Sequence, residues 1–182
     1  MKKQAVLALA VAELALAAVQ ARAGVDPATQ AKIDAQVKIV QSWASAPVLV
    51  EAVKAQNAAL PAAYKAMTQD KWTSLAPFDA FVLSFVSNSA GQFLKAKRTP
   101  VVAEAFVCAA DGTKVAFLGK PSSWIHKGKP KHDVPMTGKT WQGEVEVDQS
   151  TGLQQLQVAV PVLDGGKPIG SVTVGLQMAR LK

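Results

Sequence analysis

The sequence contains a single cysteine, Cys108, and this scarcity excludes several classes of protein. One thiol cannot form an intramolecular disulfide, and it cannot build a Cys-rich zinc or iron–sulfur module. The chain also has no Gly-x-Ser-x-Gly elbow and no phosphate-cradling glycine loop, so the usual signatures of serine hydrolases and nucleotide-binding enzymes are missing. No repeat with a period of roughly 20 to 50 residues is present, which excludes solenoids and propellers.

The sequence has no apolar run of the roughly 20 residues that a membrane-spanning helix needs. The apolar stretch near the N-terminus, 5–19, is interrupted by Glu13. Two lysines precede this stretch, and small residues occupy the two positions before 24 that a signal peptidase reads. We therefore predict a signal peptide over 1–23, cleaved after Ala23, and an exported protein in the periplasm or outside the cell. The alternative is an uncleaved amphipathic helix.

The composition is typical of one globular domain. The 182 residues are 49% hydrophobic and 18% charged, which is too apolar for a disordered chain. The net charge is +7, and three lysines lie within five residues, Lys127, Lys129 and Lys131. One short basic loop on an exported domain does not point to nucleic acid. We expect a single domain over 24–182 and no nucleic-acid partner.

The first part of this domain, 24–100, is predicted to be helical. Asp26 and Pro27 form a helix start, because aspartate caps the first turn and proline fits within it. Apolar residues then recur at helical spacing as far as Trp43, and Pro47 separates this helix from a second one that continues to Asn57. Shorter helices are predicted near Trp72, over 79–85 and over 90–97.

The second part, 101–182, changes to the period of two that is typical of strands. Strands are predicted over 102–109, 113–118, 140–147, 153–162 and 169–176. Tight turns make most of the connections, which requires a mostly antiparallel sheet, and a long polar loop, 119–138, joins the second strand to the third. In the third strand, alternation places Trp141, Gly143, Val145 and Val147 on one face. The predicted fold class is α+β, with a long N-terminal helix and short helices packed on a five-stranded sheet.

This order of elements resembles the extracellular PAS-like sensor domains called Cache or PDC domains. The stretches that carry the resemblance are Ala105 to Val115 with its Asp-Gly turn, 141–152, Val158 to Gly166, and Lys167 to Leu176. The resemblance covers about 26–180. It implies a PAS-like sheet and a stand-alone exported member, because the sequence stops at Lys182 without a kinase or chemotaxis output.

The resemblance also implies a ligand site between the sheet and the long loop. Members bind small metabolites there, often an amino acid, an amine or a carboxylate. Their Arg-x-Trp-Tyr motif falls on Ser122 to Ile125 and their Pro-Tyr-x-Asp motif on Val145 to Asp148, where only Trp124 and Asp148 match. The arginine that would clamp a carboxylate is absent here. The resemblance therefore implies ligand contacts for Trp124 and Asp148 alone.

The run 126–133, His-Lys-Gly-Lys-Pro-Lys-His-Asp, gathers most of the chemistry-bearing side chains of the loop. It is an anion site, a metal site of His126, His132 and Asp133, or a solvated surface loop. No His-x-x-x-His pair supports the metal site, so we predict no metal and no cofactor. Two tryptophans flank the loop and either wall a pocket or pin the loop to the sheet. The candidate ligand-binding residues are Trp124, His126, Lys127, Lys129, His132, Trp141 and Asp148.

These observations predict an exported Cache-like module that binds a small metabolite, a carboxylate or an amine. It would contribute to signal transduction through a membrane receptor or kinase partner, and we expect no enzymatic activity. The alternative is a ligand-free interaction module whose N-terminal helix forms a homodimer or docks on a membrane receptor. The burial of five apolar residues of this helix distinguishes the two hypotheses: Ile33, Val37, Ile39, Val40 and Trp43. Any of them that the sheet leaves exposed would indicate an interface with a partner. A hydrolase is a third hypothesis, although the groups it needs are not assembled in the sequence.

This reading predicts that Trp124→Ala and Asp148→Ala each weaken ligand binding with little effect on folding. A binding titration with the cognate ligand, together with a denaturation curve, checks both statements. Parental affinity in both variants would contradict the pocket assignment.

Overall fold

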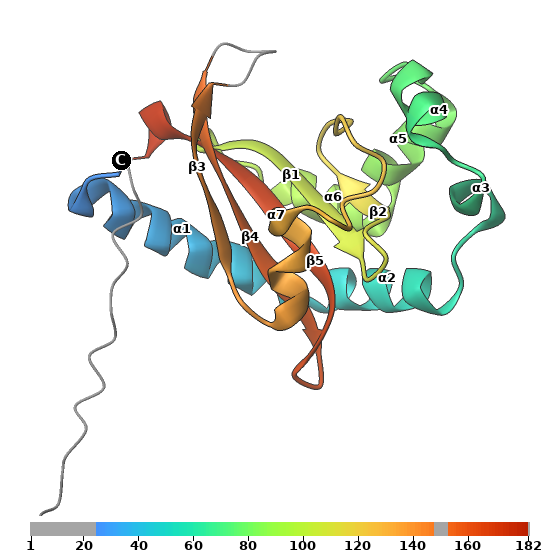
Figure 1. Cartoon of the computed structure of the whole chain (residues 1–182), viewed down its shortest axis with the longest axis horizontal. Coiled ribbons are helices and arrows are strands. Elements are labelled where there is room, and N and C mark those ends of the chain that lie inside the picture. Colours follow the sequence, from blue (N-terminus) through green and yellow to red (C-terminus); the bar gives the residue numbers. More distant parts are fainter. Residues whose placement is uncertain (1–24, 148–152, 182) are drawn as a thin grey trace, which may run out of the picture.

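The computed structural model describes residues 25–147 and 153–181 (Figure 1). The predicted signal peptide, Asp148 and the predicted turn 150–152 lie outside these ranges. Within them, no helix combines the length and apolar character needed to cross a membrane.

From residue 25 onward, six helices precede the sheet. They are α1 (Pro27–Ala44), α2 (Pro47–Ala58), α3 (Ala62–Lys65), α4 (Gln69–Ser74), α5 (Ala80–Ser87) and α6 (Ser89–Lys97). The Asp26 carboxylate accepts hydrogen bonds from the backbone N–H groups of Ala28 and Thr29, both at 3.0 Å, so the predicted helix start is confirmed. Asp79 and Asn88 cap α5 and α6 in the same way.

Five strands form one antiparallel sheet. They are β1 (Val102–Ala109), β2 (Lys114–Phe117), β3 (Trp141–Val147), β4 (Gln154–Asp164) and β5 (Lys167–Gln177). Their spatial order is β2-β1-β5-β4-β3, and every neighbouring pair is antiparallel. The predicted α+β class and the antiparallel sheet are confirmed.

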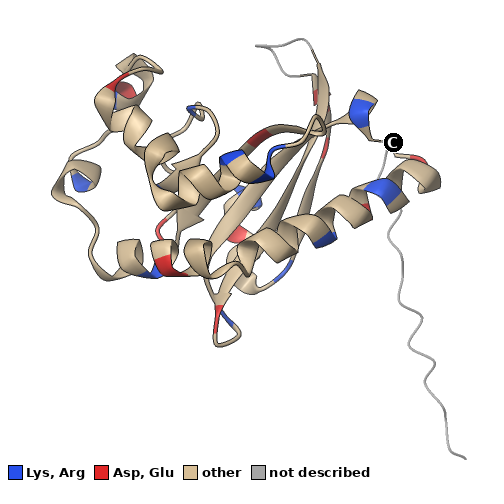
Figure 2. Ribbon diagram, turned by 180° about the vertical axis from the view of Figure 1, so that it is seen from behind, with Lys and Arg blue, Asp and Glu red and all other residues tan. Residues whose placement is uncertain are grey.

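One face of the sheet is covered by α1 and α2 (Figures 1 and 2). The prediction that the long N-terminal helix packs on the sheet is confirmed, and α2 extends this cover. Ile33 and Val40 of α1 and Leu49 of α2 are buried in this main core. The strands contribute alternate residues, and the buried ones are Leu156, Val158, Val160 and Val162 of β4, and Val172, Val174 and Leu176 of β5. This face is therefore apolar and closely packed.

The opposite face carries α7 (Pro130–Asp133) and the rest of the loop 119–138 (Figure 1). The loop is not without regular structure, because α7 is followed by a 3₁₀ turn, Pro135–Thr137. A second core of aromatic side chains fills this face at its β2 end. Its buried members are Trp72, Val82, Phe85, Phe106, Cys108, Phe117 and Trp124, and we refer to it as the aromatic core.

Two β-bulges change which face particular side chains occupy. Between β1 and β2 the register shifts next to Cys108, so that Cys108 pairs with Lys114. Between β3 and β4 it shifts within 142–145, and Val145 packs against the main core below α1. A Cβ on Gly143 would lie 2.7 Å from the Trp141 ring, so that residue and Trp141 share the other face. The prediction that Val145 shares a face with Trp141 and Gly143 was therefore wrong.

The aromatic core yields a stability prediction from two tryptophans with the same burial. The Trp72 Nε1–H donates to the Pro121 carbonyl at 2.7 Å, whereas the Trp124 Nε1–H is buried without a partner among the described residues. Both tryptophan-to-phenylalanine variants lose ring volume, but only Trp72→Phe loses a hydrogen bond and leaves a carbonyl unpaired.

We expect Trp72→Phe to lower the free energy of unfolding by about 1–3 kcal/mol more than Trp124→Phe does. Urea denaturation of the two variants and the parent checks this difference. Equal losses in the two variants would show that the Trp124 N–H has found a partner in solution.

Candidate functional site

A cavity of about 600 Å³ lies on the loop face of the sheet. The strands β1, β4 and β5 form its floor, and residues 119–122 with parts of the following loop form its wall. Its lining includes the charged and hydrogen-bonding residues Arg98, Glu104, Lys120, His126, Lys131 and Gln157. The cavity is where the sequence resemblance implied a ligand site, between the sheet and the long loop.

The described lining of the cavity carries more positive than negative charge. Arg98, Lys120 and Lys131 are its basic side chains, and Glu104 is the carboxylate among them. Burial lowers the pKa of Lys131, and the nearby Glu104 carboxylate acts in the opposite direction. Lys131 Nζ donates to Gln157 Oε1 at 2.5 Å, and the Gln157 amide in turn donates to the Glu104 carboxylate. The single described carboxylate thus shares the lining with three basic side chains, which favours a negatively charged group in the cavity.

Lys120 is held at the rim of this cavity by the aromatic core. Its Nζ donates to the Leu75 carbonyl at 2.8 Å and lies 5.0 Å from the centroid of the Trp72 ring. These contacts fix the position of the ammonium without neutralising its charge.

His126 reaches the cavity from the loop and contacts a buried lysine behind it. Its Nδ1 lies 2.5 Å from Lys114 Nζ, and its ring centroid lies 4.6 Å from that of Phe106. Lys114 is completely buried, and its Nζ also lies 3.0 Å from the Trp124 carbonyl oxygen and 3.7 Å from Cys108 Sγ. Within the described residues, no carboxylate forms an ion pair with Lys114.

His132 anchors the other end of the basic run. Its Nδ1 lies 2.8 Å from Ser171 Oγ of β5, and its side chain is 1% exposed. Ser171 pairs with Cys108 in the sheet, and Cys108 pairs with Lys114, so a polar row crosses three adjacent strands. The two histidines therefore dock the loop onto the two ends of this row.

Gly112 permits this docking at the β1–β2 turn. Its φ is +82°, and a Cβ there would collide with the backbone nitrogen of Lys127. The backbone N–H of His126 donates to the Gly112 carbonyl at 2.9 Å. The turn glycine that the sequence placed in a hairpin is thus also the point where the loop meets the sheet.

Burial sets the protonation of these side chains. Desolvation, with the nearby positive charge of Lys114 as the second cause, lowers the pKa of His126 from 6.5 to about 2. Desolvation also lowers the pKa of His132 and of Lys114, and it raises the pKa of the Cys108 thiol. Both histidines are neutral at physiological pH, and the thiol is not a reactive thiolate.

The structure brings together only some of the residues singled out in the sequence. His126 lines the cavity and His132 lies beside the same polar row. Lys129 is half-buried with its Nζ on Ser123 Oγ at 2.5 Å, and Lys127 is exposed. Trp141 is half-buried on the loop face and is not among the described lining residues. Ligand contact for this set, including Asp148 outside the described ranges, stays a prediction.

Trp124 has a different environment from the pocket wall that we predicted. It is 1% exposed and packs among Tyr64, Trp72, Phe81 and Phe85 in the aromatic core, at ring-centroid distances of 5.2–5.8 Å. Truncation of such a side chain costs about 3–5 kcal/mol. We therefore no longer expect Trp124→Ala to leave folding unaffected.

Sequence reasoning missed several residues at or behind the cavity: Arg98, Glu104, Lys114, Lys120, Lys131 and Gln157. Glu104 stands alone among the apolar residues of its strand, and this isolated charge is a signal that could have found it. Lys114 gave a weaker signal, because strict alternation from Phe117 would not have placed it on the loop face. The bulge beside Cys108 does so.

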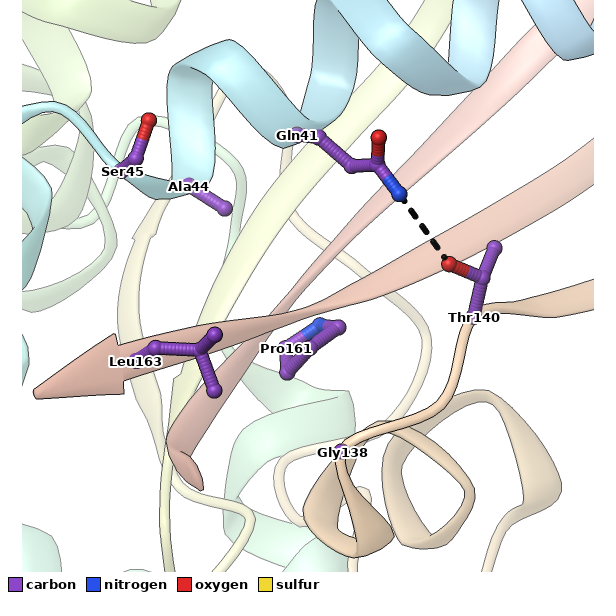
Figure 3. A pocket seen from close by; sticks show the side chains of 7 residues that line it. All are labelled: Gln41, Ala44, Ser45, Gly138, Thr140, Pro161 and Leu163. Carbon is purple, nitrogen blue, oxygen red and sulfur yellow. Dashed lines mark hydrogen bonds between the residues drawn. The ribbon is translucent and has the colours of Figure 1, made fainter. Parts of the chain in front are cut away.

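A second, smaller cavity of about 280 Å³ lies between the end of α1 and strand β4 (Figure 3). Its residues are Gln41, Ala44, Ser45, Gly138, Thr140, Pro161 and Leu163. Gln41 Nε2 donates to Thr140 Oγ1 at 3.4 Å across it. None of these lining residues is charged, so this cavity has no group that would recognise an ion. Among the described residues, no cluster of three or more histidine, cysteine or acidic side chains is placed to hold a metal.

Comparison with solved structures identifies the architecture. The chain is similar to the sensor domain of E. coli DcuS, with 13% sequence identity, a TM-score of 0.50, and coverage of 86% of this chain and 96% of that one. The chain has a Cache-type sensor-domain fold. At this level of identity the similarity establishes the fold and not the ligand.

Longer sensor domains also match the Cache fold of this chain. The V. cholerae histidine kinase DctB sensor domain has 15% identity and a TM-score of 0.46, covering 85% of this chain and 54% of that one. The ligand-binding domain of the Pseudomonas aeruginosa amino-acid chemoreceptor PctC, in complex with GABA, has 17% identity and a TM-score of 0.46, covering 84% and 56%. The chain thus spans about half the length of these two domains. No family model and no curated protein sequence matches it significantly.

The buried histidine predicts a pH dependence of stability. The folded chain keeps His126 neutral far below its usual pKa of 6.5, whereas the unfolded chain takes up a proton there as the pH falls. The unfolded state therefore binds more protons below pH 6.5, and the free energy of unfolding decreases by about 1.4 kcal/mol per pH unit from this residue. Above the unfolded pKa this contribution to stability is fully present.

His126→Gln removes this proton uptake, so we expect its stability to fall less than that of the parent between about pH 7 and pH 5. The difference in slope should approach about 1.4 kcal/mol per pH unit. Urea denaturation at several pH values measures both slopes. Parallel curves for the two proteins would mean that His126 also becomes protonated in the folded state.

Proposed function

We propose that this chain is an extracytoplasmic sensing module that binds a small organic molecule through a carboxylate group. The ligand occupies the cavity between the sheet and the loop 119–138. The observation that carries the proposal is the cavity lining, in which Arg98, Lys120 and Lys131 outnumber the carboxylate of Glu104. A cavity of about 600 Å³ is within the range of small-molecule sites.

A carboxylate fits this lining better than an amine. An amine would find one carboxylate in the described lining, Glu104, which already accepts a hydrogen bond from Gln157 and stands against three basic side chains. The two tryptophans that would attract a cation are not part of the described lining. The lysines present donors instead, and these pair most strongly with an anionic oxygen.

Export and signalling complete the proposal. The sequence pattern of 1–23 supports a signal peptide, and the sensor-domain fold supports a role in passing ligand occupancy to a membrane receptor or kinase. Any such signal requires that the ligand bind two arrangements of the module with different affinities. The fold is that of sensor domains, which supports a binding role and not catalysis.

The interaction module is less well supported. Of the five apolar residues of α1 that were to decide between the two functions, Ile33, Val40 and Trp43 are buried and Val37 is partly buried. Only Ile39 of these five is exposed, with 44% of its surface accessible to solvent. One exposed isoleucine does not make an apolar stripe for a partner helix.

A ligand screen tests the proposed function. We expect mono- and dicarboxylates such as acetate and succinate to include a stabilising ligand, and 1,4-diaminobutane, a diamine with succinate's four-carbon chain, to have no effect. A ligand at 100 times its dissociation constant adds about 2.7 kcal/mol, which a thermal-shift measurement detects. Stabilisation by the diamine alone, or by no compound, would contradict the proposal.

Two lysines between β2 and β3 provide a matched pair for any carboxylate found. Lys131 lines the cavity, whereas Lys139 is exposed and does not line it. We expect Lys131→Met to weaken binding by about tenfold through the loss of a charge-assisted hydrogen bond, and Lys139→Met to bind as the parent does. Isothermal titration calorimetry gives both affinities. An equal loss in the two variants would indicate a general effect of net charge.

A further inference from the structure

Lys114 is a buried basic side chain with no counter-ion among residues 25–147 and 153–181. It lies on β2 with no exposed surface, behind the wall of the cavity. Its three nearest polar neighbours are the Trp124 carbonyl oxygen, Cys108 Sγ and His126 Nδ1. All three neighbours are uncharged, and the Phe106 ring lies 5.3 Å from Nζ on a further side.

These surroundings match the donors of an ammonium group. An ammonium has three N–H donors and no acceptor, and it finds one acceptor for each donor here. The aromatic ring adds a favourable contact for positive charge. A buried ammonium whose neighbours are all neutral nevertheless lacks the anion that would offset its desolvation.

The same geometry determines the hydrogen on His126. An aliphatic amine is far more basic than an imidazole. Burial lowers the pKa of both groups, that of His126 to about 2, so we assign a proton shared across their 2.5 Å contact to Lys114. His126 Nδ1 then accepts from Lys114, and the proton of the neutral imidazole is on Nε2. Among the described residues, Nε2 has no hydrogen-bond partner, and His126 lines the cavity.

We propose that Lys114 is a positioning residue for ligand binding. Its ammonium holds His126 in the Nε2–H form, which gives the cavity a fixed N–H donor, and the group that this donor receives is a carboxylate. The inference rests on the proposed function for the existence of a ligand, and it adds the residue that selects a carboxylate oxygen. The bound carboxylate would lie on the other side of the His126 ring from Lys114, and it would supply the negative charge that Lys114 lacks.

The other tautomer of His126, with its hydrogen on Nδ1, would favour a different class of ligand. A neutral Lys114 amine would accept from an Nδ1–H, and His126 would then present a bare Nε2 lone pair to the cavity. A bare lone pair receives an ammonium or hydroxyl group and repels a carboxylate. The position of one hydrogen therefore separates the two ligand classes.

The first test needs no known ligand, and it uses a variant only to assign resonances. In the ¹⁵N-labelled full chain at neutral pH, the imidazole correlations of His126, assigned by their loss in His126→Gln, report which ring nitrogen carries hydrogen. We expect the Nε2–H form, with the Lys114 side chain as an ammonium. An Nδ1–H form, or a neutral Lys114 amine, overturns the inference.

The second test uses acetate as the smallest carboxylate probe and acetamide as its uncharged match. We expect acetate, and not acetamide, to shift the His126 Nε2–H resonance. Lys114→Met should release the Nε2–H preference and weaken the acetate response about tenfold, because the donor is no longer held. An undiminished response to acetate in Lys114→Met, with the Nε2–H form intact, also overturns the inference.

Variants at His126 distinguish positioning from a merely structural role. Glutamine can accept from Lys114 through its carbonyl and donate through its amide, whereas phenylalanine keeps the ring and loses both functions. We expect His126→Gln to bind acetate more tightly than His126→Phe. Equal affinities would assign the imidazole to packing.

The two proposals fail in different ways. If no organic carboxylate stabilises the chain in the thermal screen, the proposed function fails, and the hydrogen position on His126 still decides the inference. If a carboxylate binds while His126 carries hydrogen on Nδ1, the function stands and the role of Lys114 falls.

Discussion

The arrangement of the loop face depends on a polar row buried between the sheet and the loop. Ser171, Cys108 and Lys114 cross three adjacent strands, and His132 and His126 meet the two ends of the row. Buried polar groups are costly unless each finds a partner, so the row specifies where the loop must lie. The cavity wall, and hence any ligand site, follows from this registration of loop on sheet.

The two faces of the sheet use different physical interactions. Beneath α1 and α2 the contacts are apolar and closely packed, and removal of any one side chain leaves a void. On the loop face, the aromatic core fills one end, and hydrogen bonds hold the rest of the loop over the cavity. Directional contacts of this kind position donors accurately, which a site for a small charged ligand requires.

Regular elements were predictable because local rules and tertiary packing agree there. Asp26, Asp79 and Asn88 cap the helices that they precede, and each of the five strands lies within a few residues of its predicted range. The site was less predictable. Strict alternation assigned Val145 to the wrong face and gave no reason to place Lys114 behind the loop. The β1–β2 and β3–β4 pairs each contain a bulge, and beyond a bulge the side chains of a strand change faces. Trp124 matched a family motif, but its ring packs into the aromatic core.

The sequence by itself determined the fold class, the order of helices and strands, and the long basic loop after the first hairpin. These features follow from periodicity, capping and turn residues, which act over a few positions. Only the tertiary structure decided that His126 meets Lys114, and that Glu104 and Gln157 share a cavity with Lys131. It also decided that Ile39 is the one large apolar side chain of α1 that stays exposed. Those outcomes depend on strand register and on contacts between distant segments, and no local pattern encodes them.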